Sequence, residues 1–310
     1  MSPRWLWLAI GGLVAVALAV VVVARWPDSD GESTQPPPTT PTTVPPDQVV
    51  VGAGDIADCN SPGDEATAKL VAARPDAAVV TFGDNAYNSG TADEFAQCYD
   101  PTWGTAKERT RPAPGNHEYQ TPDATGYYDY FGSAAGEPGK GYYSYDLGAW
   151  HVVVLNSNCS VVSCAAGDPQ EQWLQSDLED HPADCTLAYW HHPRFSSSVR
   201  GPSTDVAPLF EALYDADADL VLEGHEHQYE RFAPLDPSGK VDEKRGIRSI
   251  VVGTGGRSHY PFGTPVPGSE ARNGDTYGII ELTLRPDSYE WSFIPEPSKT
   301  FTDSGSTDCH

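Results

Sequence analysis

Short apolar runs alternate with stretches of helical periodicity in the first half of the domain, and apolar runs dominate its end. Short, continuously apolar runs are typical of strands buried in a sheet. We expect such strands at residues 49–51, 77–82, 151–155, 187–190, 220–222, 249–252, 277–284 and 289–293. The helical patterns lie at residues 64–73, 169–179 and 205–214.

Signals at the helix ends support this assignment. Asp64 is a candidate N-cap for the first helix, and Pro75 lies just beyond its end. Pro169 stands at the start of the second helix, where proline is favoured. Helices mixed with strands, followed by a strand-rich end, predict an α/β fold in which helices pack outside two stacked mixed β-sheets.

The N-terminal segment has a different character. Residues 5–24 hold no charged or strongly polar side chain, and Arg4 and Arg25 flank them. A helix over these residues would be about 30 Å long, the thickness of a bilayer's hydrocarbon core. We therefore expect an uncleaved membrane anchor within residues 1–26. A cleaved signal peptide is the alternative: its apolar region is usually shorter, about 7–15 residues, but Val22 and Ala24 could form a cleavage site.

Both interpretations place the rest of the chain at the cell surface or in the medium. Residues 27–47 are rich in Pro, Thr, Ser and Asp and have few apolar side chains to bury, so an extended linker is expected. Residues 48–310 are numerous enough for one domain with a sizeable core.

The formal net charge is −25, and there is no basic stripe. A nucleic-acid partner is therefore not expected, and no feature of the sequence indicates a protein partner. Solubility outside the cell is the simplest explanation of the acidic balance. An anionic substrate stays compatible with it if metal cations offset the acidic field locally.

Six cysteines in an exported chain suggest disulfides, and none forms a close Cys-any-any-Cys pair of the kind found in zinc-thiolate sites. Six cysteines allow 15 pairings. Only the pair of Cys159 with Cys164 has an argument, because it closes a short loop. Cys59 with Cys98 and Cys185 with Cys309 complete the pairing that we guess.

Polar side chains follow four of the predicted strands: Asp55, Asp84, His191 and His225. Ligands of open α/β folds bind in the crevice beyond the carboxyl ends of the strands. Each residue alone could belong to an ordinary turn or be a histidine satisfied at a strand end. Together they predict a hydrolytic site that holds two metal ions.

The motifs around these residues resemble those of the calcineurin-like metallophosphoesterases, and most of all the purple acid phosphatases. The resemblance covers most of residues 48–310. It rests on Gly54-Asp55, Gly83-Asp84-Asn85-Ala86-Tyr87, Gly115-Asn116-His117-Glu118, His191-His192-Pro193 and Gly224-His225-Glu226-His227-Gln228-Tyr229-Glu230-Arg231. Most other branches have a histidine two residues after the first aspartate, where this chain has Ala57. The resemblance implies the family's four-layer α/β/β/α sandwich.

It also implies a binuclear centre in which Asp84 bridges the two metals. The first metal would be held by Asp55, Asp84, Tyr87 and His227, and the second by Asp84, Asn116, His191 and His225. A phenolate suits ferric iron, whereas imidazole and amide oxygen suit a divalent ion, so we expect Fe(III) at the tyrosine site and Fe, Zn or Mn at the other.

The resemblance gives His117 the role of protonating the leaving alcohol or of binding the phosphate. His192 would either support the metal ligands from behind or face the substrate. Animal and plant members often have a further histidine after the His191 motif, but none lies between Pro193 and Gly224. Arg194, Arg200 or His259 could replace it, although each could also be an ordinary surface residue. The run at residues 253–256 could approach the site with its backbone groups or form a turn, and we favour the turn.

The function expected is hydrolysis of phosphate monoesters by metal-activated hydroxide. The first alternative keeps the site but acts on phosphodiesters or nucleotides. The second is a non-catalytic module of the cell envelope, in which the metals only stabilise the fold. A nearly complete ligand set beside His117 argues against it, because structural metal sites are usually closed by protein ligands.

Overall fold

The computed structural model describes residues 45–310. The anchor expected within residues 1–26 lies outside the described residues, as does most of the expected linker. Within residues 45–310, no helix is both long enough and apolar enough to cross a membrane.

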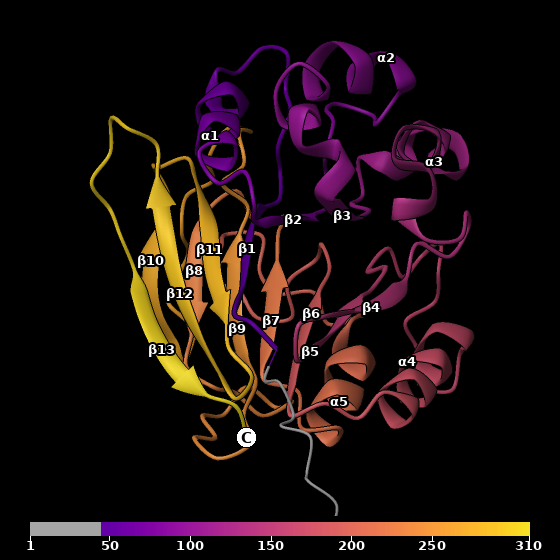
Figure 1. Ribbon diagram of the computed structural model, residues 1–310, viewed down its shortest axis with the longest axis vertical. Helices are drawn as coiled ribbons and strands as arrows, with labels where there is room; N and C mark the ends of the chain where they lie inside the picture. The colour runs from indigo at the N-terminus through magenta and orange to yellow at the C-terminus, as the bar shows by residue number, and fades with distance from the viewer. Residues whose placement is uncertain (1–44) are drawn as a thin grey trace, which may run out of the picture. The chain divides into compact units, whose positions relative to one another are not determined.

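Two β-sheets form the centre of the domain (Figure 1). The strands of the first sheet are β1 (Gln48–Ala53), β2 (Ala78–Phe82), β3 (Thr110–Ala113), β11 (Gly278–Leu284), β12 (Ser288–Pro295) and β13 (Ser304–Asp308). Their order in space is β13-β12-β11-β1-β2-β3. β1, β2 and β3 are parallel, and the remaining neighbours are antiparallel.

The strands of the second sheet are β4 (Tyr143–Leu147), β5 (Trp150–Val154), β6 (Cys185–Tyr189), β7 (Leu220–Glu223), β8 (Tyr229–Phe232), β9 (Arg248–Val252) and β10 (Ser269–Asn273). Their order is β10-β8-β9-β7-β6-β5-β4. The four central strands β5, β6, β7 and β9 are parallel. Both sheets are therefore mixed, as predicted.

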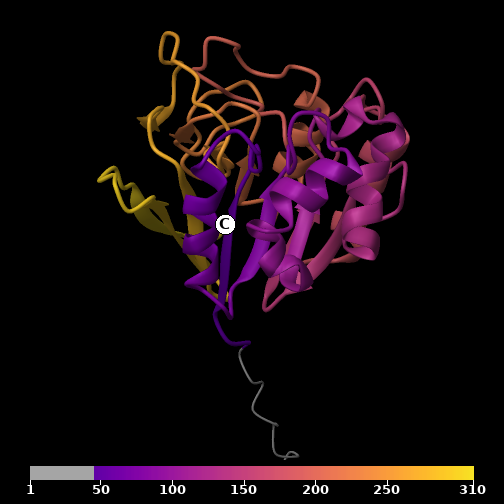
Figure 2. The same cartoon turned by 90° about the horizontal axis from the view of Figure 1, so that it is seen from above.

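Helices cover the outer faces. They are α1 (Gly63–Ala72), α2 (Ala92–Glu94), α3 (Thr125–Phe131), α4 (Pro169–Asp180) and α5 (Ala207–Asp215). α1 to α3 lie on the side of β1–β3, and α4 and α5 lie beside the second sheet (Figures 1 and 2). The expected α/β/β/α arrangement is confirmed.

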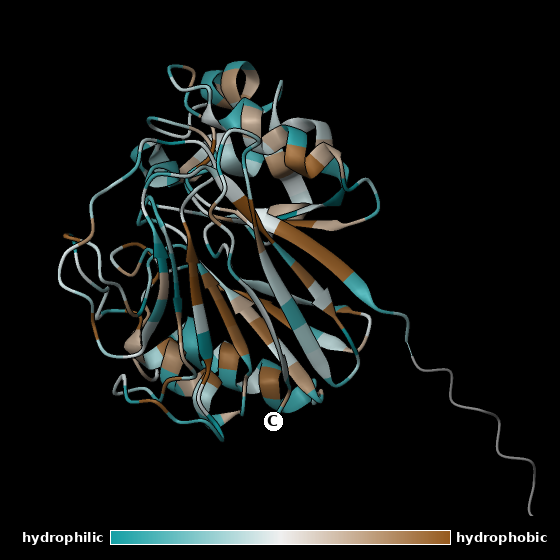
Figure 3. Cartoon of the chain, turned by 90° about the vertical axis from the view of Figure 1, so that its left-hand side faces the viewer, coloured by the Kyte–Doolittle hydropathy of each residue, from teal (hydrophilic) through white to brown (hydrophobic). Residues whose placement is uncertain are grey.

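Apolar side chains of the second sheet point to both of its faces, and both faces are covered. On β5, Val152 and Val154 belong to the core that the second sheet shares with the first, whereas Val153 packs with α4 and α5. Side chains of a strand alternate between its faces, so a strand buried on both faces is continuously apolar. Figure 3 shows such apolar segments along the strands.

Two local expectations were wrong. α1 begins at Gly63 after an N-cap at Pro62, so Asp64 lies in its first turn and not at the cap. The strands β3, β4, β8, β10 and β13 were also missed. β3 has only four residues and contains Pro112, and β8 is the segment whose Tyr229-Glu230-Arg231 was taken only as part of a motif.

All six cysteines are paired, as Cys59–Cys98, Cys159–Cys164 and Cys185–Cys309. This is the pairing guessed from the sequence. The long-range bridge Cys185–Cys309 joins the start of β6 to the segment after β13, so it links the second sheet to the last strand of the first.

Candidate metal centre

Three loops that follow parallel strands hold a polar residue in the left-handed backbone region. Asp55 has φ of 60°, Asp84 of 51° and His225 of 69°. Such values are uncommon outside glycine and concentrate at functional sites. Gly83 also has a positive φ, of 81°, which favours glycine. A side chain is excluded there for a second reason, because a Cβ would lie 2.6 Å from Nδ1 of His191.

The first group of donors surrounds the hydroxyl of Tyr87. This hydroxyl lies 2.9 Å from Oδ1 of Asp55 and 2.9 Å from Oδ2 of Asp84, and its one hydrogen can be donated to either carboxylate. It also lies 3.3 Å from Nε2 of His227, and that nitrogen is 3.3 Å from Oδ1 of Asp55. The ring of Tyr260 stacks on the His227 imidazole with centroids 3.9 Å apart, which holds the imidazole in place.

The second group surrounds Nε2 of His191. That nitrogen lies 3.3 Å from Oδ2 of Asp84, 3.2 Å from Oδ1 of Asn116 and 3.1 Å from Nδ1 of His225. The other ring nitrogen of His191 donates to the carbonyl of Phe82 at 2.7 Å. A histidine anchored in this way presents its second nitrogen to the site in a fixed orientation.

Burial and neighbouring charges shift the pKa values of several ionisable side chains in this site. Burial and the neighbouring carboxylates of Asp55 and Asp84 raise the pKa of Tyr87 well above its ordinary value. Burial opposes protonation of His191, but the Asp84 carboxylate outweighs it and raises the His191 pKa to about 9. Burial and the nearby His191 lower the pKa of His225. A bound cation would reverse this balance, favouring a phenolate and neutral imidazoles.

The donor set fits two metal ions that share Asp84. Ligands about 2.0 Å from one ion lie roughly 3 Å from each other, and the distances within each group are 2.9–3.3 Å and 3.1–3.3 Å. The donors are carboxylate, phenol, amide and imidazole, so each group offers both oxygen and nitrogen. Both aspartates are fully buried, and buried carboxylates need cationic partners.

Comparison with known proteins identifies the family of this chain. The family model described as calcineurin-like phosphoesterase matches residues 40–229. The chain belongs to this family. It is 27% identical to purple acid phosphatase 15 of Arabidopsis thaliana, over 57% of this chain and 40% of that protein. It is 30% identical to purple acid phosphatase 23 of the same plant, over 52% of this chain and 39% of that protein.

A solved structure of a purple acid phosphatase from yellow lupin seeds has the same fold, with a TM-score of 0.70 and 18% identity. The similarity covers 85% of this chain and 54% of the lupin chain. The chain thus spans about two fifths of the length of the two plant relatives and about half of the lupin structure.

His117 lies at the rim of the candidate metal centre. Its Nε2 is 3.7 Å from Oδ2 of Asp84, and its ring packs on that of Tyr87 with centroids 4.4 Å apart. Its Nδ1 contacts the carbonyl of Asn88. The imidazole is about one quarter exposed, so it can reach both the centre and a bound substrate.

The four residues considered for substrate contact have different positions. His192 lies beside the centre, with its ring centroid 4.5 Å from that of His225. Arg200 also reaches the centre: its guanidinium donates to Nε2 of His225 at 3.2 Å and to the hydroxyl of Tyr260 at 3.0 Å.

Arg194 and His259 are not brought to the centre in this way. Arg194 donates to the carbonyl of Pro237 at 2.9 Å and lies over the ring of Phe195. His259 packs on Tyr277 with ring centroids 4.3 Å apart. Arg200 and His192 are therefore the better candidates for contact with substrate.

The sequence motif included Glu118 but gave it no role. Its fully buried carboxylate accepts hydrogen bonds from the backbone N–H groups of Asp84 at 3.0 Å, Asn85 at 2.7 Å and Gly115 at 2.6 Å. One side chain thereby ties the loop after β2 to the loop after β3. Burial and the nearby Asp84 raise the Glu118 pKa to about 7.

The glycine run at residues 253–256 approaches the site, which is the alternative to the turn that we favoured. Gly255 donates its N–H to the carbonyl of Gly54 at 2.9 Å. A Cβ at Gly253 would lie 2.8 Å from Oδ2 of Asp55. The run therefore packs directly against the first loop of the site, where only glycine leaves enough room.

Proposed function

We propose that this chain is an exported phosphatase that hydrolyses phosphate monoesters at a binuclear metal centre. The observation that supports it best is the pair of donor groups that share Asp84: Tyr87, Asp55 and His227 on one side, and His191, Asn116 and His225 on the other. The family membership and the purple acid phosphatase relatives support the same reaction class.

The proposed ligands are Asp55, Asp84, Tyr87 and His227 for one ion, and Asp84, Asn116, His191 and His225 for the other. Two ions held there would supply activation of a water molecule and neutralisation of the phosphate charge. Two side chains of the protein perform the remaining steps. Arg200 binds and orients the phosphate, and His117 delivers a proton to the leaving alcohol.

The test is to compare hydrolysis of an aryl phosphate monoester with that of the corresponding bis-aryl diester by the purified full chain, alongside its metal content. We expect two metal ions per chain and a faster monoester reaction. A faster diester reaction would assign the site to phosphodiesters instead. Full turnover after exhaustive chelation would rule out the metal-dependent mechanism altogether.

Export is supported by the three disulfides, which form and persist in oxidising compartments. We propose that residues 1–26 direct this export as an uncleaved anchor. N-terminal sequencing of the mature protein distinguishes the anchor, which keeps the segment, from a cleaved signal peptide, which loses it.

Ferric iron beside Tyr87 would give the protein a colour. We expect the pure protein to be violet to pink because of charge transfer from the phenolate to iron, and Tyr87→Phe to be colourless. Visible absorption and iron analysis of the two proteins check this. An active parent protein that is colourless and free of iron would contradict the assignment of iron but leave the rest of the site intact.

Replacing His117 should slow the reaction in a way that depends on the leaving group. His117→Gln keeps a polar side chain but cannot donate a proton as an acid, so kcat should fall roughly 10²–10³-fold for an alkyl phosphate. An aryl phosphate, whose leaving group needs little protonation, should lose much less. Equal losses on both substrates would instead indicate that His117 binds phosphate.

Replacing Arg200 tests the phosphate contact. Arg200→Ala should lower kcat/KM by about 10–100-fold, mostly through KM, because a hydrogen bond to a charged group contributes roughly 1.5–3 kcal/mol. Arg200→Lys should recover part of the loss, since lysine keeps the charge but not the forked geometry. The matched control is Arg285→Ala, whose guanidinium pairs with Glu290 on β12. An unchanged KM in Arg200→Ala would remove Arg200 from the site.

A further inference from the structure

A second cluster of ionisable side chains lies at the opposite edge of the second sheet. His151 is the second residue of β5, and Asp177 and His181 stand at the end of α4 and just after it. The centre described above follows the carboxyl ends of the parallel strands, whereas this cluster lies near their amino ends. It therefore plays no part in the proposed phosphatase reaction.

The three side chains meet at the Asp177 carboxylate, and one ligand atom from each lies within 4.8 Å of the others. Nε2 of His151 lies 2.9 Å from Oδ2 of Asp177, and Nδ1 of His181 lies 3.5 Å from Oδ1 of the same carboxylate. Asp177 and His181 are four residues apart, the spacing that places two side chains on one face of a helix. The two imidazoles are stacked, with centroids 5.0 Å apart and planes inclined by only 4°, so the half-exposed His181 ring would turn to direct its nitrogen at an ion held by His151 and Asp177.

These distances suit the coordination of one ion. Two ligands about 2.0 Å from a tetrahedral ion are roughly 3.3 Å apart, and the observed separations of 2.9 and 3.5 Å lie on either side of that value. In the structure, Nδ1 of His181 donates to the carbonyl of Asp177 at 2.9 Å. Binding an ion through this nitrogen would exchange that one part-buried hydrogen bond for a metal bond.

A fourth residue, Asp146, contacts the outer ring nitrogen of His151. Oδ1 of Asp146 lies 3.0 Å from Nδ1 of His151, on the far side of the ring from Asp177. A carboxylate on the outer nitrogen of a metal-binding histidine fixes the tautomer and strengthens the inner nitrogen as a ligand. His151 and Asp177 are buried, so the inner part of the site is rigid.

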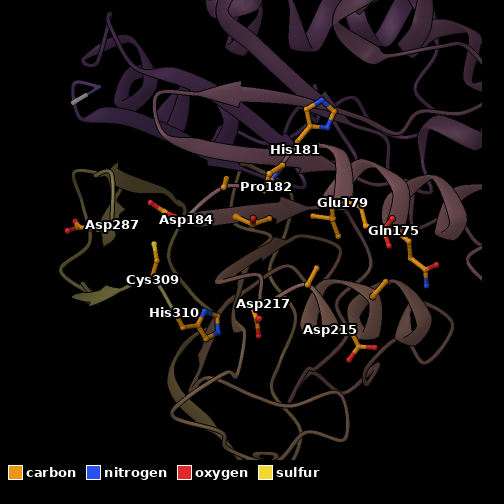
Figure 4. A pocket seen from close by; sticks show the side chains of 15 residues that line it. Gln175, Glu179, His181, Pro182, Asp184, Asp215, Asp217, Asp287, Cys309 and His310 are labelled. Carbon is orange, nitrogen blue, oxygen red and sulfur yellow. The ribbon is translucent and has the colours of Figure 1, made fainter. Parts of the chain in front are cut away.

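Solvent reaches the cluster from two sides. His181 is half exposed and lines both a hollow of about 500 Å³, shared with Asp146 and His151, and one of about 860 Å³. Figure 4 shows His181 at one end of the larger hollow, with Asp215 and Asp217 farther along it. The acidic residues of this face, including Asp184 and Glu179, favour the approach of a cation.

We propose that His151, Asp177 and His181 bind one Zn²⁺ ion, with solvent completing its coordination. Two imidazoles and one carboxylate are typical zinc ligands. Such an ion would tie the end of α4 to β5. The alternative is an ion-pair cluster, in which a protonated His151 bridges Asp146 and Asp177 and no metal binds.

The test is equilibrium dialysis of the full chain against Zn²⁺, followed by metal analysis. We expect His181→Ala to bind one zinc ion fewer per chain than the parent, with an unchanged rate of phosphate-ester hydrolysis. Asp146→Asn, which alters only the outer carboxylate, should weaken this zinc ion about 10–100-fold. The control is His310→Ala, which removes another imidazole from the same hollow and should keep the parent's zinc content.

Equal zinc contents in the parent and in His181→Ala would overturn the proposal. So would a loss that His310→Ala reproduces, since it would mean nonspecific binding to surface histidines. An unchanged zinc affinity in Asp146→Asn would show that His151 is not a ligand and would remove the three-residue site. None of these results depends on the metal content of the phosphatase centre, which all three variants leave intact.

Discussion

Asp84→Asn will lower kcat/KM for a phosphate monoester by roughly 10³-fold or more. The change preserves the size of the side chain, and the amide oxygen can still accept the backbone N–H of His117, which lies 2.8 Å from Oδ1. What it removes is the negative charge next to both Tyr87 and His191. Both proposed ions share this residue, so both should be lost or bound more weakly.

The measurement is steady-state hydrolysis together with metal analysis of the same preparation. Asp287→Asn, a change at a residue that lines the hollow on the opposite edge, is the control and should keep the activity and metal content of the parent. A variant at Asp84 that keeps two ions and more than about a tenth of the activity would show that Asp84 is not the shared ligand.

Glu118→Ala will destabilise the folded protein by about 3 kcal/mol, because it leaves three buried backbone N–H groups without an acceptor. The same change frees the loop of Asp84 from the loop of Gly115, so metal affinity should fall as well. Urea unfolding monitored by tryptophan fluorescence gives the change in the free energy of unfolding.

Glu118→Gln separates charge from hydrogen bonding. It keeps one acceptor oxygen and should cost about 1 kcal/mol. Glu137→Ala, at an exposed glutamate that pairs with Lys140, should change the free energy of unfolding by less than about 0.5 kcal/mol. If Glu118→Ala unfolds at the same urea concentration as the parent, the carboxylate does not hold the two loops together.

Patterns local in the sequence predicted much of the fold. The apolar runs at residues 77–82 and 220–222 became β2 and β7, and the helical pattern at residues 169–179 became α4. These predictions succeed because a strand buried on both faces and a helix with one buried face each leave their own periodicity in the sequence. β3 left no such signal, since it is short and contains Pro112.

For the candidate metal centre too, the sequence predicted one part of the arrangement and missed another. The sequence shows Asp55, Asp84, His191 and His225 after strands, and the carboxyl ends of parallel strands meet at one edge of a sheet. It does not show that Glu118 reaches back over more than 30 residues to the N–H groups of Asp84 and Asn85. Nor does it show that Arg200 turns toward His225 while Arg194 turns toward Pro237.

The sequence by itself determined which elements form and which chemical groups stand at their ends, because both depend on neighbours a few residues away. The tertiary structure alone decided which of those groups meet. The contacts of Tyr87 with His227, of Glu118 with Asp84 and of His151 with Asp177 join segments 26–140 residues apart. Such contacts depend on how the two sheets and their helices pack, and no local periodicity records that packing.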